Sequence, residues 1–456
     1  MKYIILILFV AVQGCLFFNT VDPPSGTSDL GTIDSATPVD LGPSVDLGPS
    51  VDLGPSEDLG PSEDLDMRNV TDKCDSNAQC TKNKICTENV CVCKMGYEAE
   101  GENCIVGQIV KKVTRLETTI TDGMTESKTT FTASNSTQVV PFLSGRSTRF
   151  APKNAHFLPN ITGSEIAFSR IGNAGSVNVA ANLVEFDETH VEVTKGELSL
   201  NIGDRVTQLT MIGIVPEKSF LVFYTSFDPL NADNPITLEH TSIRGTISEN
   251  QIEFGRLEGS GKVAIRWYLI VSKGDAFRVD HKAISIAKNK KNSEPFTDLP
   301  NTLLLWSNQT SRSSFREGHT RCQYVPLVNG GASFVRCSRG KIDTDTTLDA
   351  IEIALQAVHF KNPKMTVKHF ESNMEREVRR NIVINNLSEK DTVLLGQLGS
   401  AGSVVLTQGT FKQSSAHPAM CSVWITKNAT QKDVIEIKRN SENQKAQVSI
   451  QYVSWF

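Results

Sequence analysis

The chain lacks the local signatures that identify the common hydrolase and nucleotide-binding classes. It has no His-Glu-x-x-His zinc motif and no Gly-x-Ser-x-Gly nucleophile turn. Its nearest approach to a phosphate-binding loop, Gly259-Ser260-Gly261-Lys262, lacks the earlier glycine and the following Ser or Thr. The eight histidines are scattered without metal-ligand spacing. These absences argue against an enzyme and against a resident cofactor.

The chain also lacks an apolar run long enough to span a bilayer. Lys2 precedes an apolar run from Tyr3 to Val12, which Gln13 and Gly14 end, whereas a spanning helix needs about 20 apolar residues. One positive charge followed by a short apolar run is typical of a secretory signal. The sequence therefore predicts a signal peptide over residues 1–14.

The end of this signal resembles the lipobox of bacterial lipoproteins. The segment Val12-Gln13-Gly14-Cys15 places a small residue before a cysteine, although Gln13 is not the usual small residue at its position. The resemblance implies that Cys15 is lipidated and anchors the secreted chain to a membrane. The residue after this cysteine is Leu16 rather than Asp, and the resemblance then implies sorting to the outer membrane and the cell surface. The alternative is an ordinary signal cleaved after Gly14, with Cys15 left as a free thiol.

Positive charge is missing from the segment that follows. Residues 16–66 contain eleven Asp or Glu and no Lys or Arg, and Asp-Leu-Gly-Pro-Ser occurs in them four times between Asp40 and Ser62. Repeated proline prevents helix formation, like charges repel, and the few apolar groups cannot offset the entropy of ordering. Residues 15–66 are therefore predicted to form a disordered, extended linker.

Six of the ten cysteines are crowded into the next 31 residues. Cys74, Cys80, Cys86, Cys91, Cys93 and Cys104 lie in a segment, residues 67–105, with few apolar side chains. A segment this small cannot bury enough surface to fold unaided, which favours three disulfides, and fifteen pairings are open. A zinc site is the alternative interpretation, although a secreted chain with six clustered cysteines favours disulfides.

The last cysteines of this segment resemble the end of an EGF-like module. The run from Cys91 to Tyr97 has the form Cys-x-Cys followed by Gly and an aromatic residue, and Cys104 closes it after six further residues. Members of that family pair their cysteines first with third, second with fourth and fifth with sixth. The resemblance therefore implies three disulfides: Cys74–Cys86, Cys80–Cys91 and Cys93–Cys104.

The remainder of the chain has the alternation of strands and the turn spacing of an all-β protein. A two-strand signature recurs four times in it. A short strand of the form Ile/Val-x-Ile/Phe/Cys-x-Arg leads to a longer apolar strand. The four copies lie at 166–186, 252–270, 335–360 and 435–455. We expect four tandem antiparallel β-sandwich repeats of about six strands, each with its own core. Their predicted bounds are 106–187, 188–273, 274–362 and 363–456.

The repeated arginines, Arg170, Arg256, Arg339 and Arg439, have two interpretations. They are either a ladder for acidic ligands or, as we favour, groups that lie in solvent at a strand end or cap a sheet edge. In the third repeat, Cys322 and Cys337 lie on strands expected to be neighbours and are predicted to form a disulfide.

Calcium is the one cofactor for which weak candidate ligands exist. Carboxylates cluster in two predicted loops, at Asp228 and Asp233 and at Asp343, Asp345 and Asp349. Neither loop has the glycine or the spaced glutamate of an EF-hand, so plain polar turns are the alternative. Basic runs are short and lack interleaved aromatic residues, which argues against nucleic acid as a partner.

Three functional hypotheses remain. The first is adhesion to an unknown protein partner through loops at the sandwich ends, with repetition adding avidity. The second is glycan binding. The layout of each repeat, a hydrophobic strand, an intervening strand, a hairpin and a closing strand with Trp or Phe, is similar in topology to the six-stranded sandwich of H-type lectins. The third and least favoured is a secreted hydrolase on a β scaffold.

Overall fold

The computed structural model describes the chain from the cysteine-rich segment onward. The residues described are 76–77, 80, 83–88, 90–94, 97–100, 103–148, 152–228, 242–257, 261–286, 291–295, 302–309, 320–325, 334–339, 351–363, 365–374, 379–383, 402–411, 421–427, 433–439 and 446–455. Contacts divide the chain into two units, Met1–Arg68 and Asn69–Phe456, and all these residues belong to the second. Their regular secondary structure is almost entirely β-strand, which confirms the predicted all-β class.

Two short antiparallel hairpins form the cysteine-rich segment. The first pairs β1 (Lys84–Thr87) with β2 (Val90–Cys93), and the second pairs β3 (Tyr97–Glu100) with β4 (Asn103–Val106). Isolated two-stranded hairpins are marginally stable at best in water. This segment therefore depends on its covalent cross-links.

Those cross-links are disulfides. Cys80 is bonded to Cys91 and Cys93 to Cys104, which are two of the pairs that the EGF-like resemblance implies. Cys86 is also disulfide-bonded, while Cys74 lies outside the described residues. A cysteine in a disulfide has no thiolate to offer a metal, so the zinc interpretation is wrong for these five cysteines.

The rest of the described chain consists of four repeats of six strands. The strands of repeat 1 are β5 (Val110–Ile120), β6 (Glu126–Thr130), β7 (Val139–Ser147), β8 (Leu158–Thr162), β9 (Glu165–Ser169) and β10 (Val177–Phe186). Those of repeat 2 are β11 (Val191–Leu200), β12 (Val206–Thr210), β13 (Ser219–Asp228), β14 (Arg244–Ser248), β15 (Gln251–Gly255) and β16 (Lys262–Ser272). Short 3-10 turns, η2 (Ser136–Gln138) and η3 (Pro216–Lys218), precede the third strands of repeats 1 and 2.

Repeats 3 and 4 continue the same series. The strands of repeat 3 are β17 (Phe277–Ile286), β18 (Lys291–Pro295), β19 (Thr302–Gln309), β20 (Thr320–Val325), β21 (Phe334–Arg339) and β22 (Ile351–Phe360). Those of repeat 4 are β23 (Thr366–Met374), β24 (Arg379–Val383), β25 (Gly402–Phe411), β26 (Cys421–Lys427), β27 (Asp433–Arg439) and β28 (Ala446–Trp455).

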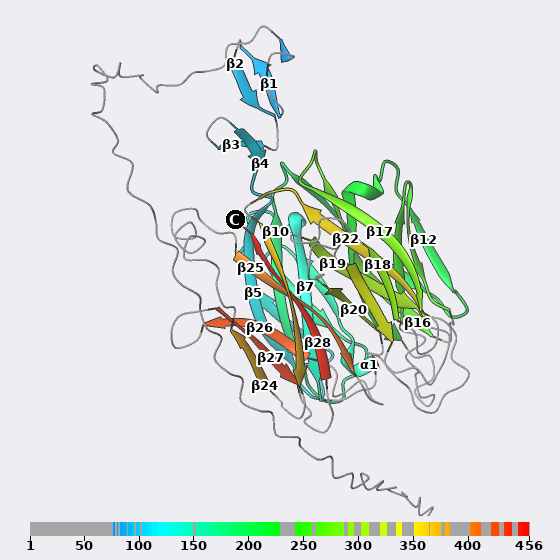
Figure 1. The fold of residues 1–456 in the computed structure, drawn as a ribbon. Helices are drawn as coiled ribbons and strands as arrows, with labels where there is room; N and C mark the ends of the chain where they lie inside the picture. The colour runs from blue at the N-terminus through cyan, green and yellow to red at the C-terminus, as the bar shows by residue number, and fades with distance from the viewer. Residues whose placement is uncertain are drawn as a thin grey trace, which may run out of the picture. The chain divides into compact units, whose positions relative to one another are not determined.

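Each repeat contains two three-stranded antiparallel sheets with one topology (Figure 1). The first sheet has the order first–sixth–third strand, as in β5–β10–β7, and the second has the order second–fifth–fourth, as in β6–β9–β8. In repeat 3, Cys322 lies directly opposite Cys337 on β20 and β21, and the two form a disulfide. The recurring sequence signature corresponds to the fifth and sixth strands, which are the central strands of the two sheets.

The sixth strands are buried on both faces. In β10, Val177, Val179, Ala181 and Leu183 pack in the core of their own repeat, whereas Val184 and Phe186 on the opposite face belong to a different core. Alternate residues of a strand point to opposite faces, so such a continuous apolar run requires cover on both sides. The second cover comes from the other repeats.

All four repeats contribute to that second, shared core. Its members include Val110 and Phe186 from repeat 1, Phe220 and Ile270 from repeat 2, Leu303 and Phe360 from repeat 3, and Val367 and Val453 from repeat 4. Repeats 1, 2 and 3 each have a described core of their own, as predicted, but the repeats are not separate beads, because this second core joins them. Residues 69–456 form one compact unit because the first sheets pack against each other.

Glutamine side chains close two of the junctions between repeats. The third strand of a repeat is an edge strand of its first sheet, so its outward N–H and C=O groups lack a partner strand. The Gln356 amide accepts from Leu221 N at 2.8 Å and donates to Leu221 O at 2.9 Å, and Gln451 does the same to Leu304 at 2.7 and 2.6 Å. Each glutamine is 5% exposed, and its amide satisfies both backbone groups as a neighbouring strand would.

The junction between repeats 1 and 2 uses a different side chain. Pro141 is the third residue of β7, as Leu221 is the third residue of β13, and it has no N–H to donate. The Tyr224 hydroxyl instead donates to Pro141 O at 2.6 Å and accepts from Leu143 N at 3.3 Å. Burial raises the pKa of Tyr224 above its ordinary value, so the hydroxyl remains a donor.

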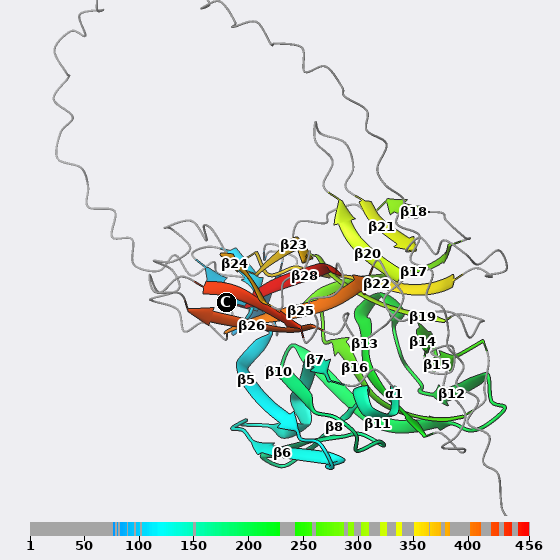
Figure 2. The same ribbon diagram turned by 90° about the horizontal axis from the view of Figure 1, so that it is seen from below.

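A basic residue in the first strand bonds across each described junction. Lys195 donates to Ser136 O at 3.2 Å, His281 Nε2 donates to Pro216 O at 3.0 Å, and His369 Nε2 donates to Thr302 O at 2.9 Å. Strands β25 and β26 of repeat 4 in turn contact β5, β7 and β10 of repeat 1 (Figure 2). The junctions therefore link the four repeats in a closed circuit.

The His369 junction is expected to weaken in acid. Burial lowers the pKa of His369 to about 4 from 6.5, although its bond to Thr302 opposes this shift. The unfolded chain binds the proton near pH 6.5, so stability present above that pH is lost as the pH falls to about 4, by roughly 3 kcal/mol. Denaturant unfolding measured at pH 7 and pH 4 tests this.

A matched variant isolates the histidine from the many carboxylates that also titrate. His369→Gln keeps an N–H donor at the junction and removes the titrating ring. The variant should lose less stability than the wild type between pH 6.5 and 4. Equal losses would show that His369 does not carry the acid sensitivity.

Candidate functional site

Each sandwich has two ends with different connections. In repeat 1, three connections join the first to the second, the third to the fourth and the fifth to the sixth strand. The strand registers place their described residues at one end, named here the loop end; these residues are 121–125, 148, 152–157 and 170–176. The other end carries the segments that join one repeat to the next, such as 187–190 and 273–276. We name it the linker end.

A buried arginine organises the loop end of repeat 1. Arg170 is 4% exposed, and its guanidinium donates to six backbone carbonyl groups drawn from all three connections. The acceptors are Thr121 (3.0 Å), Met124 (2.8 Å), Asn154 (3.0 Å), Asn173 (3.2 Å), Ala174 (3.3 Å) and Gly175 (2.6 Å). One planar fork therefore fixes three loops against each other.

Repeat 2 repeats part of this arrangement. Arg256, 2% exposed, donates to Asp204 O at 2.8 Å and to Asn201 O at 2.6 Å, in the connection that corresponds to 121–125. Its buried Nη1 has no hydrogen-bond partner among the described residues. The expectation of solvated or edge-capping arginines is therefore wrong for Arg170 and Arg256. The side chains of Arg339 and Arg439 lie outside the described part of the chain.

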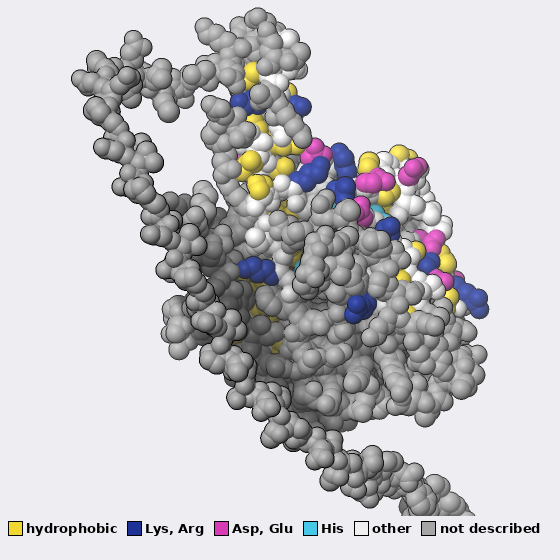
Figure 3. Space-filling model, viewed as in Figure 1, with side chains coloured by type: hydrophobic (Ala, Val, Ile, Leu, Met, Phe, Trp, Pro, Cys, Tyr) yellow, Lys and Arg dark blue, Asp and Glu magenta, His cyan; other side chains and the backbone are white. Residues whose placement is uncertain are grey.

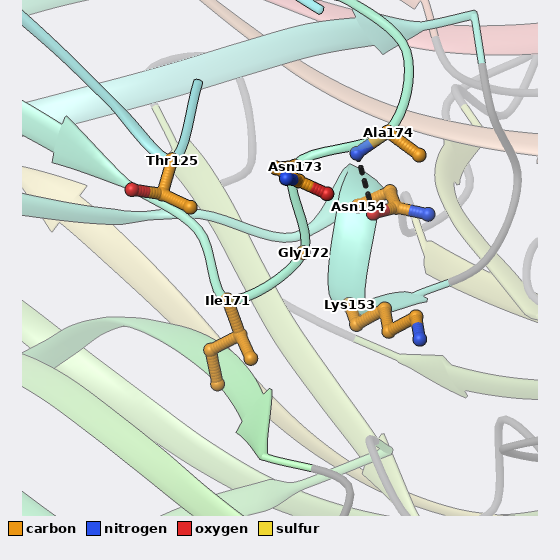
Figure 4. Close-up of a pocket in the computed structure, with 7 residues that line it drawn as sticks. All are labelled: Thr125, Lys153, Asn154, Ile171, Gly172, Asn173 and Ala174. Carbon is orange, nitrogen blue, oxygen red and sulfur yellow. Dashed lines mark hydrogen bonds between the residues drawn. The ribbon is translucent and has the colours of Figure 1, made fainter. Parts of the chain in front are cut away.

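The loops fixed by Arg170 line a cavity of about 400 Å³ that is widely open to solvent (Figure 4). Its lining comes from the short helix α1 (Pro152–Ala155) and from the loops on either side, and consists of Thr125, Lys153, Asn154, Ile171, Gly172, Asn173 and Ala174. The Asn154 side-chain oxygen accepts from Ala174 N at 3.2 Å, and Gly172 N donates to Lys153 O at 2.7 Å. Two hydrogen bonds thus join α1 to the loop 171–174.

A glycine is required at the base of this cavity. A Cβ atom on Gly172 would lie 2.0 Å from Asn154 Oδ1 and 3.0 Å from Lys153 Cγ. Real Cβ atoms do not approach other atoms this closely, so any larger residue would displace Asn154. This cavity was not predictable from the sequence, because its lining residues come from three loops that no single sequence motif covers.

The charge around the cavity is positive. Burial lowers the pKa of Arg170, while the nearby Asp122 carboxylate raises it in part, and a guanidinium stays protonated in either case. One Asp122 oxygen already accepts from Gly175 N at 2.5 Å. Lys153 forms no ion pair with any described residue. The cavity therefore favours an electron-rich ligand.

Exposed apolar side chains also mark the loop ends. Met124 is 54% exposed in repeat 1 and Ile202 is 52% exposed in the corresponding connection of repeat 2. At the linker end, Ile212 is 95% exposed. On the face shown in Figure 3, the described acidic and basic side chains are interspersed rather than gathered by sign.

The linker end is tied to the cysteine-rich segment. Asn362, in the connection between repeats 3 and 4, donates to Val106 O at 2.9 Å and to Gly107 O at 3.1 Å. The Tyr97 hydroxyl donates to Asp275, between repeats 2 and 3, at 3.2 Å. The chain thus enters the repeats at the end opposite the loop ends.

The structure places few of the calcium candidates. Asp228 ends β13 without a described side chain, and Asp233, Asp343, Asp345 and Asp349 lie outside the described residues, as does Cys15. Within the described ranges, no three His, Cys, Asp or Glu side chains lie close enough together to hold a metal ion. No described helix is both long and apolar enough to cross a membrane.

A hydrogen-bonded series of three polar side chains in repeat 3 was also not predicted from the sequence. His359 Nε2 donates to Asp280 at 3.0 Å, and His359 Nδ1 lies 2.8 Å from the Thr302 hydroxyl. This order of hydroxyl, imidazole and carboxylate is that of an activated nucleophile. Thr302 has no exposed surface, so its hydroxyl cannot reach a substrate. The line instead supports the strand that accepts the bond from His369.

No protein-family model matches the chain, and no curated protein is significantly similar to it in sequence. The site is therefore interpreted from its own geometry.

Proposed function

We propose that the chain is a non-enzymatic, surface-anchored interaction protein that presents the loop ends of its repeats to a partner. In this proposal residues 1–14 direct secretion, a lipid on Cys15 anchors the chain at the cell surface, and the acidic linker holds an EGF-like module and the repeats away from the membrane. The partner meets the loop ends, and several repeats in one chain increase avidity.

The observation that carries the proposal is that the loop ends lie opposite the end at which the chain enters the repeats. The chain enters the repeats at the linker end, where Asn362 and Tyr97 form their bonds to either side of that entrance. The loop ends are held by Arg170 and Arg256 and expose Met124 and Ile202. Rigid loops with exposed apolar residues bind a partner at a low entropic cost.

Glycan binding is the second candidate, and the cavity of repeat 1 favours it. A concave site with a few placed polar groups is the usual form of a small-molecule site. Purified full chain on arrays of matrix proteins and glycans, with calcium and with a chelator, separates the candidates. Retention on protein spots supports adhesion, and a sugar-specific signal supports glycan binding. Silence on both would contradict the proposed role.

Substitution at the two ends tests which surface makes the contact. Met124→Glu together with Ile202→Glu should weaken retention by about tenfold, because charge replaces apolar contact surface at two loop ends. Ile212→Glu, a comparable change at the linker end, should leave retention unchanged. The reverse pattern would assign the contact to the linker end.

A further inference from the structure

We propose that the cavity at the loop end of repeat 1 binds a sugar that carries a carboxylate. The proposal deepens the second candidate function above and rests on the loop end being a binding surface. It follows from the chemistry of the lining, from its charge and from its rigidity, which are separate observations.

The lining offers hydrogen-bond donors at an open cavity. Asn154 is 5% exposed, and its side-chain oxygen is already bonded to Ala174 N. Its amide nitrogen has no partner among the described residues, so this donor is available to a ligand. Asn173 and Thr125 add an amide and a hydroxyl from the neighbouring loops. Hydroxyl-rich ligands are bound by sets of this kind.

The charge of the lining selects among such ligands. Lys153 is the one charged residue of the lining, and Arg170 donates to the backbone carbonyl of the next residue, Asn154. The nearest compensating carboxylate, Asp122, is occupied by Gly175 N. Two cations and one engaged anion leave a positive potential, which favours a carboxylate over a neutral sugar.

The size and apolar content of the cavity fit a sugar ring better than a simple anion. Its volume of about 400 Å³ lies within the range of small-molecule sites, well above what an inorganic anion fills. Ile171, 39% exposed, provides an aliphatic surface for the C–H groups of a ring. An anion alone would leave that surface unpaired.

The cavity is rigid before any ligand arrives. Arg170 ties together the loops that form it, and Gly172 lets α1 approach without a clash. A preformed site loses little freedom on binding, so even a single sugar residue is expected to bind measurably.

Titration of the full chain with glucuronate and with glucose, followed by NMR or calorimetry, tests the proposal. Glucuronate should bind at least about tenfold more tightly than glucose, and its affinity should fall as salt is added, because a partly exposed charge pair is screened. Equal affinity for the two sugars, or no binding of glucuronate, would overturn the proposal.

Three single-residue variants test separately the charge of the lining, its free hydrogen-bond donor and the space beside α1. Lys153→Gln should reduce the preference for glucuronate to about threefold or less, because one of the two cations is lost. Asn154→Asp keeps the oxygen that accepts from Ala174 N, removes the free donor and repels a carboxylate, so it should abolish binding of glucuronate. Gly172→Ala should abolish binding of both sugars. Lys282→Gln, on an exposed strand position of repeat 3, is the matched control and should bind as the wild type does.

Failure of this inference can be told apart from failure of the proposed function. Lys153→Gln leaves Met124 and Ile202 intact, so retention on a protein partner should survive it. If glucuronate does not bind but retention depends on Met124 and Ile202, the sugar assignment alone is wrong. Unchanged glucuronate binding by Lys153→Gln would likewise contradict the assignment.

Discussion

Replacing Arg170 with methionine is expected to lower the free energy of unfolding by about 3–5 kcal/mol, the range for breaking a buried charged network. The substitution removes seven hydrogen bonds and leaves six carbonyl groups of the three loops without their common donor. Urea denaturation of the full chain measures the change. Hydrogen exchange at 121–125 and 171–175 should accelerate most, because these loops lose their shared anchor.

Arg278→Met is the matched control for this experiment. Its side chain is 47% exposed and bonds to Asp280 at the surface, so its removal should cost less than about 1 kcal/mol. Arg170→Lys keeps the charge but not the planar fork and should fall between the two. A loss below about 1 kcal/mol for Arg170→Met would mean that the loops hold their positions without it.

Replacing Gln356 with leucine is expected to cost about 2–4 kcal/mol, because Leu221 N–H and C=O remain buried at the junction without a partner. Leucine has a similar size, so the loss reports hydrogen bonding rather than a cavity. The measurement is the same denaturation experiment, with exchange at the Leu221 amide as a local readout.

The same substitution at Gln208 provides the control, because this exposed side chain bonds only to the half-buried Glu253 among the described residues. Gln208→Leu should change stability by less than about 0.5 kcal/mol. Gln356→Leu combined with Gln451→Leu should give nearly additive losses, since the two glutamines close different junctions. A neutral Gln356→Leu would show that apolar packing alone holds repeats 2 and 3 together.

The fold class and the repeat were predictable because both rest on local pattern. The signature around Arg170 and Arg256 marks the fifth strand, and the run from Ile351 to Phe360 marks a sixth strand. That run is apolar on both faces, with Val358 and Phe360 opposite in parity to Ile351 and Ile353. This was the available sign that a second layer covers the sixth strand. This second layer was not predicted, because the size of one repeat suggested a sandwich that needs no other repeat to cover its sheets.

The site was less predictable because it depends on contacts between distant residues. A fixed arginine in each repeat indicated a structural constraint, yet sequence spacing does not show that Arg170 reaches Thr121 and Asn154 from the other two loops. In the same way, Gly172 and Asn154 are ordinary loop residues until α1 brings them together. The disulfides Cys80–Cys91, Cys93–Cys104 and Cys322–Cys337 were predictable, by contrast, because the EGF-like resemblance of the cysteine spacing and the expected strand order had already connected their positions.

The shared core has an evolutionary consequence. A single repeat cut from this chain would expose its part of that core and would be expected to associate with copies of itself, so the four repeats have the arrangement of a homo-oligomer whose subunits are fused into one chain. In an oligomer of identical subunits, a change in one loop appears in every copy. Fusion removes that restriction, and a cavity such as the one beside α1 can specialise in one repeat while the other repeats keep their own loops.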